Sequence, residues 1–239
     1  MNLKEFQEIF KEECSKNNIE FDEKKSEQLY KYMTLILEWN EKINVTAIKD
    51  EKEFIVKHFI DSLTINKFIS NTDRVLDIGT GAGFPGIPLK IYNTEKDFSL
   101  IDSVNKKITV LNDVIEKLKL PNIEALHIRA EDLAKDSNYR EQFDVVTTRA
   151  VSNLATIAEY MLPFVKVGGK AVCMKGPNVE QELEESKKAI KLLGGEIETV
   201  ENLNINGNFE RNIVIIKKVK NTDKKYPRGQ GKPAKEPIR

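Results

Sequence analysis

The chain has 239 residues, of which 40% are hydrophobic and 32% charged, and its formal net charge is zero. These proportions are typical of a globular protein, and no apolar run approaches the roughly 20 residues of a membrane-spanning helix. The N-terminal MNLKEFQEIFKEEC lacks the uninterrupted apolar stretch of a secretory signal, so we expect a cytoplasmic protein without a membrane partner. With two cysteines and two histidines, we expect neither a disulfide nor a metal site.

Residues 1–70 are predicted to form an N-terminal helical cap. Apolar residues recur at helical spacing in three segments, namely 3–14, 29–43 and 50–69. His58 shares the apolar face of the third segment, and a satisfied interior histidine is more common there than a catalytic base. We expect Asp61 or Ser62 to bond to it.

Residues 71–220 alternate between short apolar segments and helical segments. The apolar segments are rich in β-branched residues and read RVLDIG, DFSLID, IEALHIR, FDVVTTR and KAVCMK. Helical sequences such as VNKKITVLNDVIEKLKL separate them, which predicts a mostly parallel sheet with ligands at the carboxyl ends of its strands. Two last segments, EIETVENLNI and ERNIVIIKKV, are joined by the turn-forming Asn206-Gly207-Asn208, and this hairpin requires an antiparallel strand.

Residues 221–239 form a basic tail. From residue 217 onward there are nine Lys or Arg against Asp223 and Glu236, so the rest of this neutral chain carries about seven negative charges. Three prolines predict that the tail is extended. Such a tail either binds the phosphates of a polyanion or only keeps the protein soluble.

The stretch LDIGTGAGFPGIPL, residues 76–89, is the most informative motif in the chain. Gly81, Gly83 and Gly86 have the G-x-G-x-x-G spacing of a dinucleotide-binding turn, which would make the protein an NAD-dependent oxidoreductase. Asp77 opposes this interpretation, since a carboxylate is unfavourable beside a pyrophosphate but suits the amino group or sulfonium of S-adenosylmethionine (AdoMet). The two prolines in the stretch cannot donate a backbone hydrogen bond to a phosphate, so the loop favours AdoMet.

Acidic residues follow the next two strands. Asp102 ends DFSLID, where a carboxylate can accept both hydroxyls of a ribose in either cofactor class. In HIRAEDL, after the third strand, the backbone of Ala130 and the side chain of Glu131 or Asp132 can bind the edge of an adenine. The two acids are equally consistent with an ordinary first helical turn, where the helix dipole favours carboxylates.

The DxGxGxG loop, Asp102, the AED sequence and the terminal hairpin together resemble class I AdoMet-dependent methyltransferases. The resemblance implies a Rossmann-like α/β sheet of seven strands with the last one antiparallel. TTRAVSNL after the fourth strand lacks the N-P-P-aromatic signature of many amino-group methyltransferases, and Cys173 fits an apolar strand better than a nucleophilic role. Guanine N7 has a free lone pair and no proton to remove, so its methylation needs alignment rather than a base, and we assign no catalytic residue.

A more specific resemblance covers residues 39–238. WNEKINVTAI, HFIDSL, LDIGTGAGFPGIPL, FDVVTTRAV and YPRGQGKPAKEPI are similar to the bacterial 16S ribosomal RNA guanine-N7 methyltransferases, also called glucose-inhibited division protein B. The resemblance implies methylation of N7 of guanosine 527 in that RNA. The residues that it implies as AdoMet contacts are Gly79, Phe84, Asp102, Ala130, Glu131 and Arg149. Arg149, at the end of the fourth strand, can equally orient the guanine or its phosphate.

The same resemblance favours RNA binding by the basic tail. We expect Lys175, at the end of the fifth strand, and Arg228 and Lys232, in YPRGQGKP, to contact phosphates of 16S rRNA or of the small ribosomal subunit. We expect a monomer. A ribosome-binding factor without catalysis is the remaining alternative, and the intact AdoMet motif opposes it.

Overall fold

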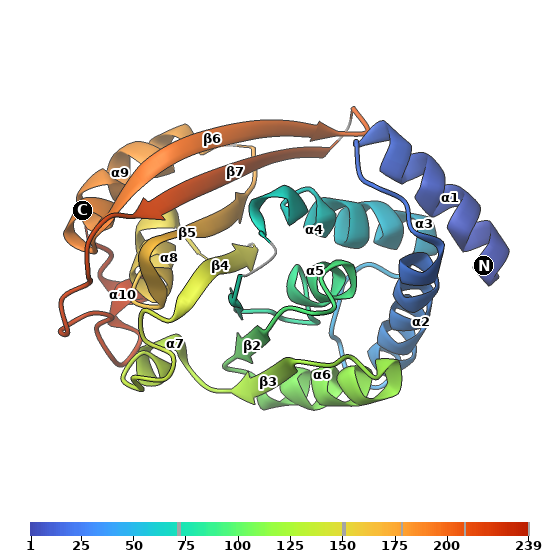
Figure 1. Cartoon of the computed structure of the whole chain (residues 1–239), viewed down its shortest axis with the longest axis horizontal. Coiled ribbons are helices and arrows are strands. Elements are labelled where there is room, and N and C mark those ends of the chain that lie inside the picture. The colour runs from blue at the N-terminus through green and yellow to red at the C-terminus, as the bar shows by residue number, and fades with distance from the viewer. Residues whose placement is uncertain (71–72, 150–151, 178, 208, 239) are drawn as a thin grey trace.

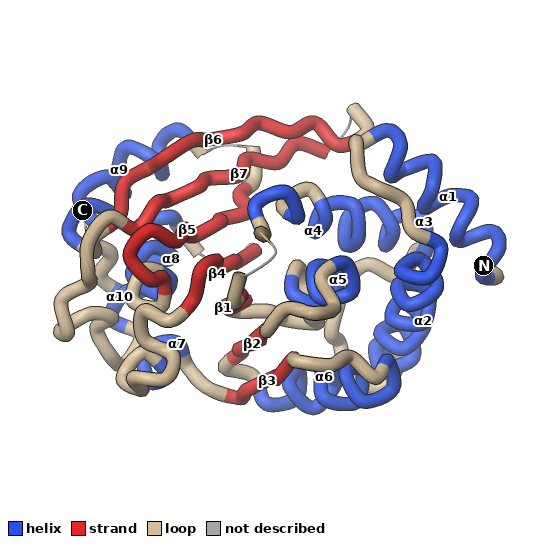
Figure 2. The backbone as a smooth tube through the Cα atoms, viewed as in Figure 1, coloured by secondary structure: helices blue, strands red, loops and turns tan. Residues whose placement is uncertain are grey.

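The computed structural model of the chain describes residues 1–70, 73–149, 152–177, 179–207 and 209–238. Its strands form one sheet of seven in the order β3-β2-β1-β4-β5-β7-β6 (Figures 1 and 2). The strands are β1 (Val75–Ile78), β2 (Phe98–Asp102), β3 (Ile123–His127), β4 (Phe143–Arg149), β5 (Val165–Lys175), β6 (Gly195–Ile205) and β7 (Phe209–Lys218). Neighbouring strands from β1 to β5 are parallel, whereas β7 is antiparallel to both β5 and β6. The predicted sheet with an antiparallel last strand is confirmed.

Helices lie on both faces of this sheet. In chain order they are α1 (Leu3–Lys16), α2 (Glu23–Asn40), α3 (Glu51–Phe54), the π-helical η1 (Ile55–Ile60), α4 (Asp61–Leu63), the 3-10 turn η2 (Asn66–Phe68), α5 (Gly86–Tyr92), α6 (Asn105–Leu118), α7 (Ala130–Leu133), α8 (Leu154–Met161), α9 (Glu180–Leu192) and α10 (Lys232–Lys235). Side chains of Asn2, Asp22 and Asp50 accept backbone N–H groups at the starts of α1, α2 and α3. Within the described ranges, no helix is both long and apolar enough to cross a membrane.

Successive side chains of the central strands point to opposite faces of the sheet. Leu76 of β1 and Val146 of β4 pack in one hydrophobic cluster with α8 and α9. Their neighbours Val75 and Val145 point the other way, into a cluster that includes Leu89 of α5. This period of two is the pattern that made the strands recognisable in the sequence.

The predicted cap helices cover the face that also carries α5 and α6. Phe6 of α1 and Phe59 of η1 belong to the same buried cluster as Ile87 of α5 and Leu111 of α6. The third predicted helix is a continuous run of α3, η1 and α4, with a π-helical segment in its middle. In Figure 1 this run crosses above α5, which brings it to the glycine loop.

The terminal hairpin reaches across the molecule to the cap. β6 and β7 run along the top of Figure 1 toward the C-terminal end of α1. Asn206, in the turn with a positive φ of 57°, accepts a hydrogen bond from the Asn17 amide at 3.2 Å. Gly207 also has a positive φ, a conformation that glycine adopts readily in turns, and Asn208 lies outside the described residues.

The basic tail is not extended, so that expectation is wrong. The guanidinium of Arg140 donates to the carbonyl oxygens of Thr222 and Tyr226, both at 2.9 Å. Pro233 is buried in the one-turn α10, which packs beside α8. Proline fixes only φ, and these contacts fold the segment back onto the protein.

Candidate active site

A groove runs along the carboxyl ends of β1 and β2. Its larger half, a cavity of about 450 Å³, is lined by Phe84, by Arg149 and by Thr46 from the cap. Its smaller half, of about 140 Å³, lies against α7 and α8 and includes Tyr160. Gly79, Asp102 and Ser103 line both halves, so the two cavities adjoin each other at these residues.

The structure brings together every residue predicted to contact AdoMet. Those in the larger half or at the junction are Gly79, Phe84, Asp102 and Arg149, and those in the smaller half are Ala130 and Glu131. Ser103, Lys107 and Tyr160 also line the groove but were not predicted from the sequence. Lys107 stands one turn into the helix after Asp102, a position that could have been anticipated, whereas nothing around Tyr160 in the sequence marks it.

Asp102 holds the junction of the two halves. One carboxylate oxygen accepts the backbone N–H of Gly81 at 3.0 Å, and the other accepts that of Val104 at 2.9 Å. Lys107 approaches the first oxygen at 3.5 Å. The end of β2 is thereby tied to the glycine loop, and the carboxylate lies where the two cavities meet.

Gly83 allows the glycine loop to lie against the cap. Its φ is +100°, and a Cβ atom there would stand 2.6 Å from the hydroxyl of Tyr32. That hydroxyl donates to the carbonyl oxygen of Ala82. Backbone freedom and close packing therefore both require glycine at this position.

Asp77 has a different role from the one expected. It is fully buried and lines neither half of the groove, so the expectation that it faces a cofactor cation is wrong. Its carboxylate accepts the N–H of Gly86 and the hydroxyl of Thr147, each at 3.1 Å. The first N–H of α5, which a dinucleotide pyrophosphate would need, is therefore already occupied by the chain's own carboxylate.

Gly86 also has a packing role. A Cβ atom there would lie 2.3 Å from a methyl carbon of Leu100, so only glycine lets α5 approach β2 this closely. The G-x-G-x-x-G spacing is thus satisfied for reasons unrelated to phosphate binding. This geometry removes the structural basis of the NAD interpretation.

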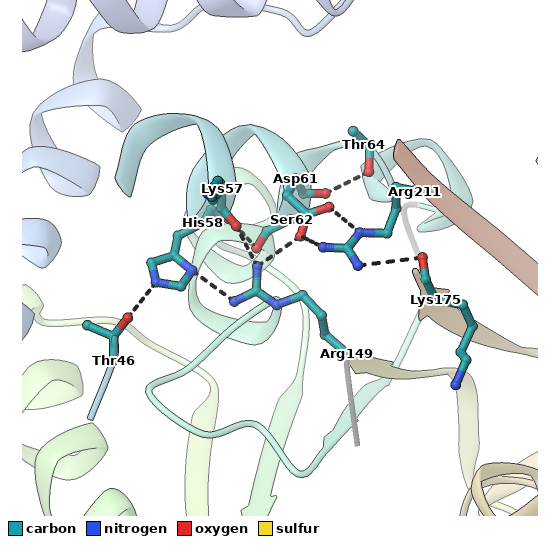
Figure 3. A network of polar contacts seen from close by, with 9 residues as sticks. All are labelled: Thr46, Lys57, His58, Asp61, Ser62, Thr64, Arg149, Lys175 and Arg211. Carbon is teal, nitrogen blue, oxygen red and sulfur yellow. Dashed lines mark hydrogen bonds and ion pairs between the residues drawn. The ribbon is translucent and has the colours of Figure 1, made fainter. Parts of the chain in front are cut away.

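Arg149 is held at the wall of the groove by a network that includes three hydrogen bonds of equal length (Figure 3). Its guanidinium donates to the carbonyl oxygen of Lys57, to the carboxylate of Asp61 and to Nδ1 of His58, each at 3.0 Å. It also lies 5.0 Å from the centre of the Phe84 ring. The cap therefore fixes the direction of this charge toward the glycine loop.

His58 is neutral in this network. Arginine only donates, so Nδ1 accepts, and the proton lies on Nε2, which faces the hydroxyl of Thr46 at 2.8 Å. Burial, reinforced by the charge of Arg149, lowers the pKa of His58 to about 3. The expected interior position is confirmed, but Asp61 and Ser62 are not its side-chain partners, and Ser62 donates to its backbone carbonyl at 2.6 Å.

Asp61 joins two arginines that are far apart in sequence. It is fully buried, and besides Arg149 it accepts two hydrogen bonds from Arg211 of β7, at 2.8 and 2.9 Å. Figure 3 shows the carboxylate between the two guanidinium groups. No local pattern distinguishes Arg211 from other charged residues, because only the fold brings the terminal hairpin to this point.

The three residues predicted to bind RNA are placed in different surroundings. Lys175 pairs with Glu182 at 2.8 Å, and Arg228 pairs with the buried Glu159 at 2.7 Å. The side chain of Lys232 is exposed. Their contact with RNA stays a prediction, and of the three only Lys232 has an exposed side chain.

Both cysteines are buried, at 1% exposure or less. Burial raises the pKa of each thiol to about 12, which disfavours the nucleophilic thiolate. Across the parts of the chain that the structure describes, no three His, Cys, Asp or Glu side chains gather in a metal-binding arrangement.

Comparison with known proteins identifies the family. The family model described as rRNA small subunit methyltransferase G, GidB, matches residues 25–214. The chain belongs to this family. A protein of Clostridium tetani named "Ribosomal RNA small subunit methyltransferase G" is 46% identical over 98% of this chain and 99% of its own length. A protein of Alkaliphilus oremlandii with the same name is 45% identical over 98% of this chain and the whole of its own length.

Solved structures agree with this membership at the level of the fold. M. jannaschii TYW2 in complex with AdoMet has a TM-score of 0.51 at 20% identity, over 65% of this chain and 74% of that one. M. capricolum TrmK in complex with S-adenosyl-homocysteine has a TM-score of 0.52 at 20% identity, over 68% of this chain and 70% of that one. The class I methyltransferase fold is therefore confirmed.

Proposed function

We propose that this chain transfers a methyl group from AdoMet to N7 of a guanosine in 16S rRNA, guanosine 527 in the RNA numbering. The observation that carries the proposal is the single groove in which all the predicted AdoMet residues meet, in a chain of the rRNA small subunit methyltransferase G family. AdoMet supplies a sulfonium-bound methyl group: the N7 lone pair forms the new bond to carbon while the electron pair of the S–CH₃ bond stays on sulfur. The positive charge passes to the guanine.

The residues of the groove fit the parts of AdoMet. The smaller half has the apolar side chains of Ile78, Ile101 and Ile128 for an adenine ring, with Glu131 at its edge. Asp102, at the junction, can accept ribose hydroxyls once Lys107, whose side chain is 35% exposed, moves aside. The methionine part then lies in the larger half.

Arg149 provides a fixed positive charge in the larger half of the groove. We propose that this charge favours the carboxylate of AdoMet. The three hydrogen bonds that the guanidinium donates to the cap, together with the Phe84 ring, hold it in place before the ligand arrives. A carboxylate would then bind there without the entropic cost of ordering the arginine.

No general base is needed for this reaction. N7 carries no proton, so the protein contributes alignment of the lone pair with the methyl group. His58 is unsuited to be a base, because both its ring nitrogens already have protein partners and its pKa is lowered to about 3 by burial. This agrees with a site whose polar groups position rather than exchange protons.

The proposal includes a monomeric enzyme in the cytoplasm, acting on 16S rRNA or the small ribosomal subunit. Exposed lysines in the tail support contact with RNA phosphates.

The test is methylation with AdoMet labelled in its methyl group, offered free 16S rRNA, an assembly intermediate and finished small subunits in parallel. We expect label on guanine N7, located by mass spectrometry of nucleosides and by chain cleavage at 7-methylguanosine. Label at another base atom, or in no RNA, would overturn the proposal.

The Asp102→Ala variant tests whether Asp102 binds the ribose. We expect it to weaken S-adenosyl-homocysteine binding at least about tenfold, because a ribose would lose a charged acceptor. Asp132→Ala is the control, since that carboxylate is exposed and pairs with Lys135 on the surface. Equal binding by the Asp102→Ala and Asp132→Ala proteins, measured by calorimetry, would contradict the assignment.

A further inference from the structure

The folded-back tail touches the smaller half of the groove. The backbone N–H of Gly231 donates to Oε1 of Glu131 at 3.1 Å, and Glu131 is only 5% exposed. Glu131 belongs to the wall of the cavity assigned above to adenine. A residue 100 positions away in sequence therefore binds one oxygen of a side chain that lines the pocket.

Arg228 fixes the tail three residues before that contact. Its Nε and backbone N–H donate to one oxygen of Glu159, at 2.9 and 2.8 Å, and Nη2 donates to the other at 2.7 Å. Glu159 is fully buried in α8, and the next residue, Tyr160, lines the same cavity. A bidentate arginine–carboxylate ion pair is among the stronger and more directional polar contacts in proteins.

Two further bonds close the tail around Gly231. Nη2 of Arg228 also donates to the carbonyl oxygen of Glu236 at 2.8 Å. The hydroxyl of Thr156 in α8 donates to the carbonyl oxygen of Pro233 at 2.9 Å. Residues 228–236 thus form a loop pinned on both sides of Gly231, so the position of its N–H is determined by α8 rather than by free tail motion.

We propose that the loop 228–236 positions Glu131 to read the adenine of AdoMet, with Arg228 as a positioning residue for cofactor binding. The inference rests on the proposed function, because it takes the smaller half of the groove as the adenine site. Gly231 donates to Oε1 of Glu131, which leaves Oε2 as the acceptor that we assign to the 6-amino group. Docking of the tail and binding of AdoMet then stabilise each other, because coupling between two binding events is reciprocal.

The direct test is calorimetric binding of S-adenosyl-homocysteine to the full-length protein and to Arg228→Gln. We expect binding about tenfold weaker in the variant, since it breaks a charge-assisted pair and releases the loop. Arg228→Lys keeps the charge and one hydrogen bond, and we expect it to restore part of the affinity. Lys224→Gln removes one positive charge from an exposed tail position and is the control, with unchanged affinity.

A second measurement separates positioning from a loss of structure. S-inosyl-homocysteine carries an oxygen where adenine carries its amino group, so Glu131 should reject it. We expect Arg228→Gln to reduce the preference for the adenine ligand over the inosine ligand, which a general loss of folded protein would leave unchanged. S-adenosyl-homocysteine should also slow tryptic cleavage of the tail in the unsubstituted protein.

The outcomes distinguish the two proposals. Unchanged affinity and unchanged preference in Arg228→Gln would overturn the positioning role and leave the proposed function intact. Failure of the unsubstituted protein to bind S-adenosyl-homocysteine would overturn the proposed function, and this inference with it. Should Arg228→Gln not fold, Glu159→Gln, which keeps the shape of the side chain and removes its charge, is measured in the same way and with the same criteria.

Discussion

Asp77 shows how a single residue can shape the candidate site without lining its groove. The carboxylate is fully buried, and burial raises its pKa from the ordinary 3.8 to about 6, although Gly86 and Thr147 donate to it. The folded protein therefore binds more protons than the unfolded chain between these two pH values. The contribution of Asp77 to the free energy of unfolding consequently falls as pH rises through this window.

Asp77→Asn should remove this dependence on pH. By the linkage relation, the difference in unfolding free energy between variant and unsubstituted protein should move in favour of the variant by up to about 3 kcal/mol from pH 4 to pH 7. Urea unfolding at several pH values measures this difference, in which the other titrating groups cancel. If this difference in unfolding free energy stays constant from pH 4 to pH 7, Asp77 ionises in the folded protein at little cost.

The contribution of His58 to the free energy of unfolding should change with pH in the opposite direction. Its pKa is lowered from 6.5 to about 3, so its stabilising contribution is present above pH 6.5 and is lost as the pH falls toward 3. His58→Gln, which can still accept from Arg149 and donate to Thr46, should lose less stability on acidification. Thermal unfolding at pH 7 and pH 5 tests this, with the expectation that the unsubstituted protein shows the larger drop in Tm.

At the scale of elements, the sequence predicted what local periodicity and glycine determine. The strands, the helices between them and the turn at Asn206-Gly207 followed from patterns within a few residues. The direction of β7 followed from the absence of a helix before it. These features depend on neighbours along the chain, which the sequence displays directly.

Contacts between distant elements were not predictable in the same way. Asp61 of α4 meets Arg211 of β7, and Arg228 of the tail meets Glu159 of α8. No spacing rule relates members of these pairs, and in the sequence each is an isolated charge. The six residues predicted to contact AdoMet were named together because a family resemblance, not periodicity, related them.

Gly83 is the point where the glycine loop and helix α2 depend on each other. Gly83→Ala would place a Cβ atom 2.6 Å from the Tyr32 hydroxyl and 2.7 Å from a side-chain carbon of Ile87, in a backbone conformation with φ +100°. We expect a loss of roughly 2–4 kcal/mol in unfolding free energy, from strain together with overpacking. Gly168→Ala is the matched control, because its φ is +90° with no atom within 4 Å of the added carbon.

Denaturant unfolding of both variants separates the two causes. Gly168→Ala reports the cost of the left-handed backbone alone, about 1 kcal/mol. A Gly83→Ala protein no less stable than the control would mean that Tyr32 and α2 shift at no cost, contrary to a tightly packed contact between cap and loop.

At the scale of the whole molecule, opposite charges are segregated along a neutral chain. The last 23 residues carry a surplus of seven positive charges, and the rest carries about the same negative charge. The fold uses part of the positive charge internally, since Lys218 and Arg228 pair with Glu141 and Glu159. Removing residues 221–239 would therefore disturb the groove as well as any RNA contact, and exposed lysines are a cleaner probe.

Combined replacement by alanine of the exposed tail lysines, Lys224, Lys225, Lys232 and Lys235, should weaken binding to 16S rRNA. For every lysine that binds a phosphate, its removal should make the slope of log K against log salt shallower by about 0.7 to 0.9, because fewer counterions are released on binding. Fluorescence anisotropy with a labelled RNA fragment over a series of KCl concentrations measures both quantities. Affinity for S-adenosyl-homocysteine should stay the same, since these side chains are not part of the groove.

The control replaces four exposed lysines of the cap, Lys4, Lys11, Lys24 and Lys31, and changes the net charge by the same amount. If the tail binds phosphates directly, the cap variant keeps a steeper salt slope than the tail variant. If only the overall charge attracts RNA, both variants lose affinity equally, because long-range attraction does not depend on which lysines are removed. Equal losses would thus reject the tail as an RNA-binding segment and leave its contact with Glu131 as its remaining role.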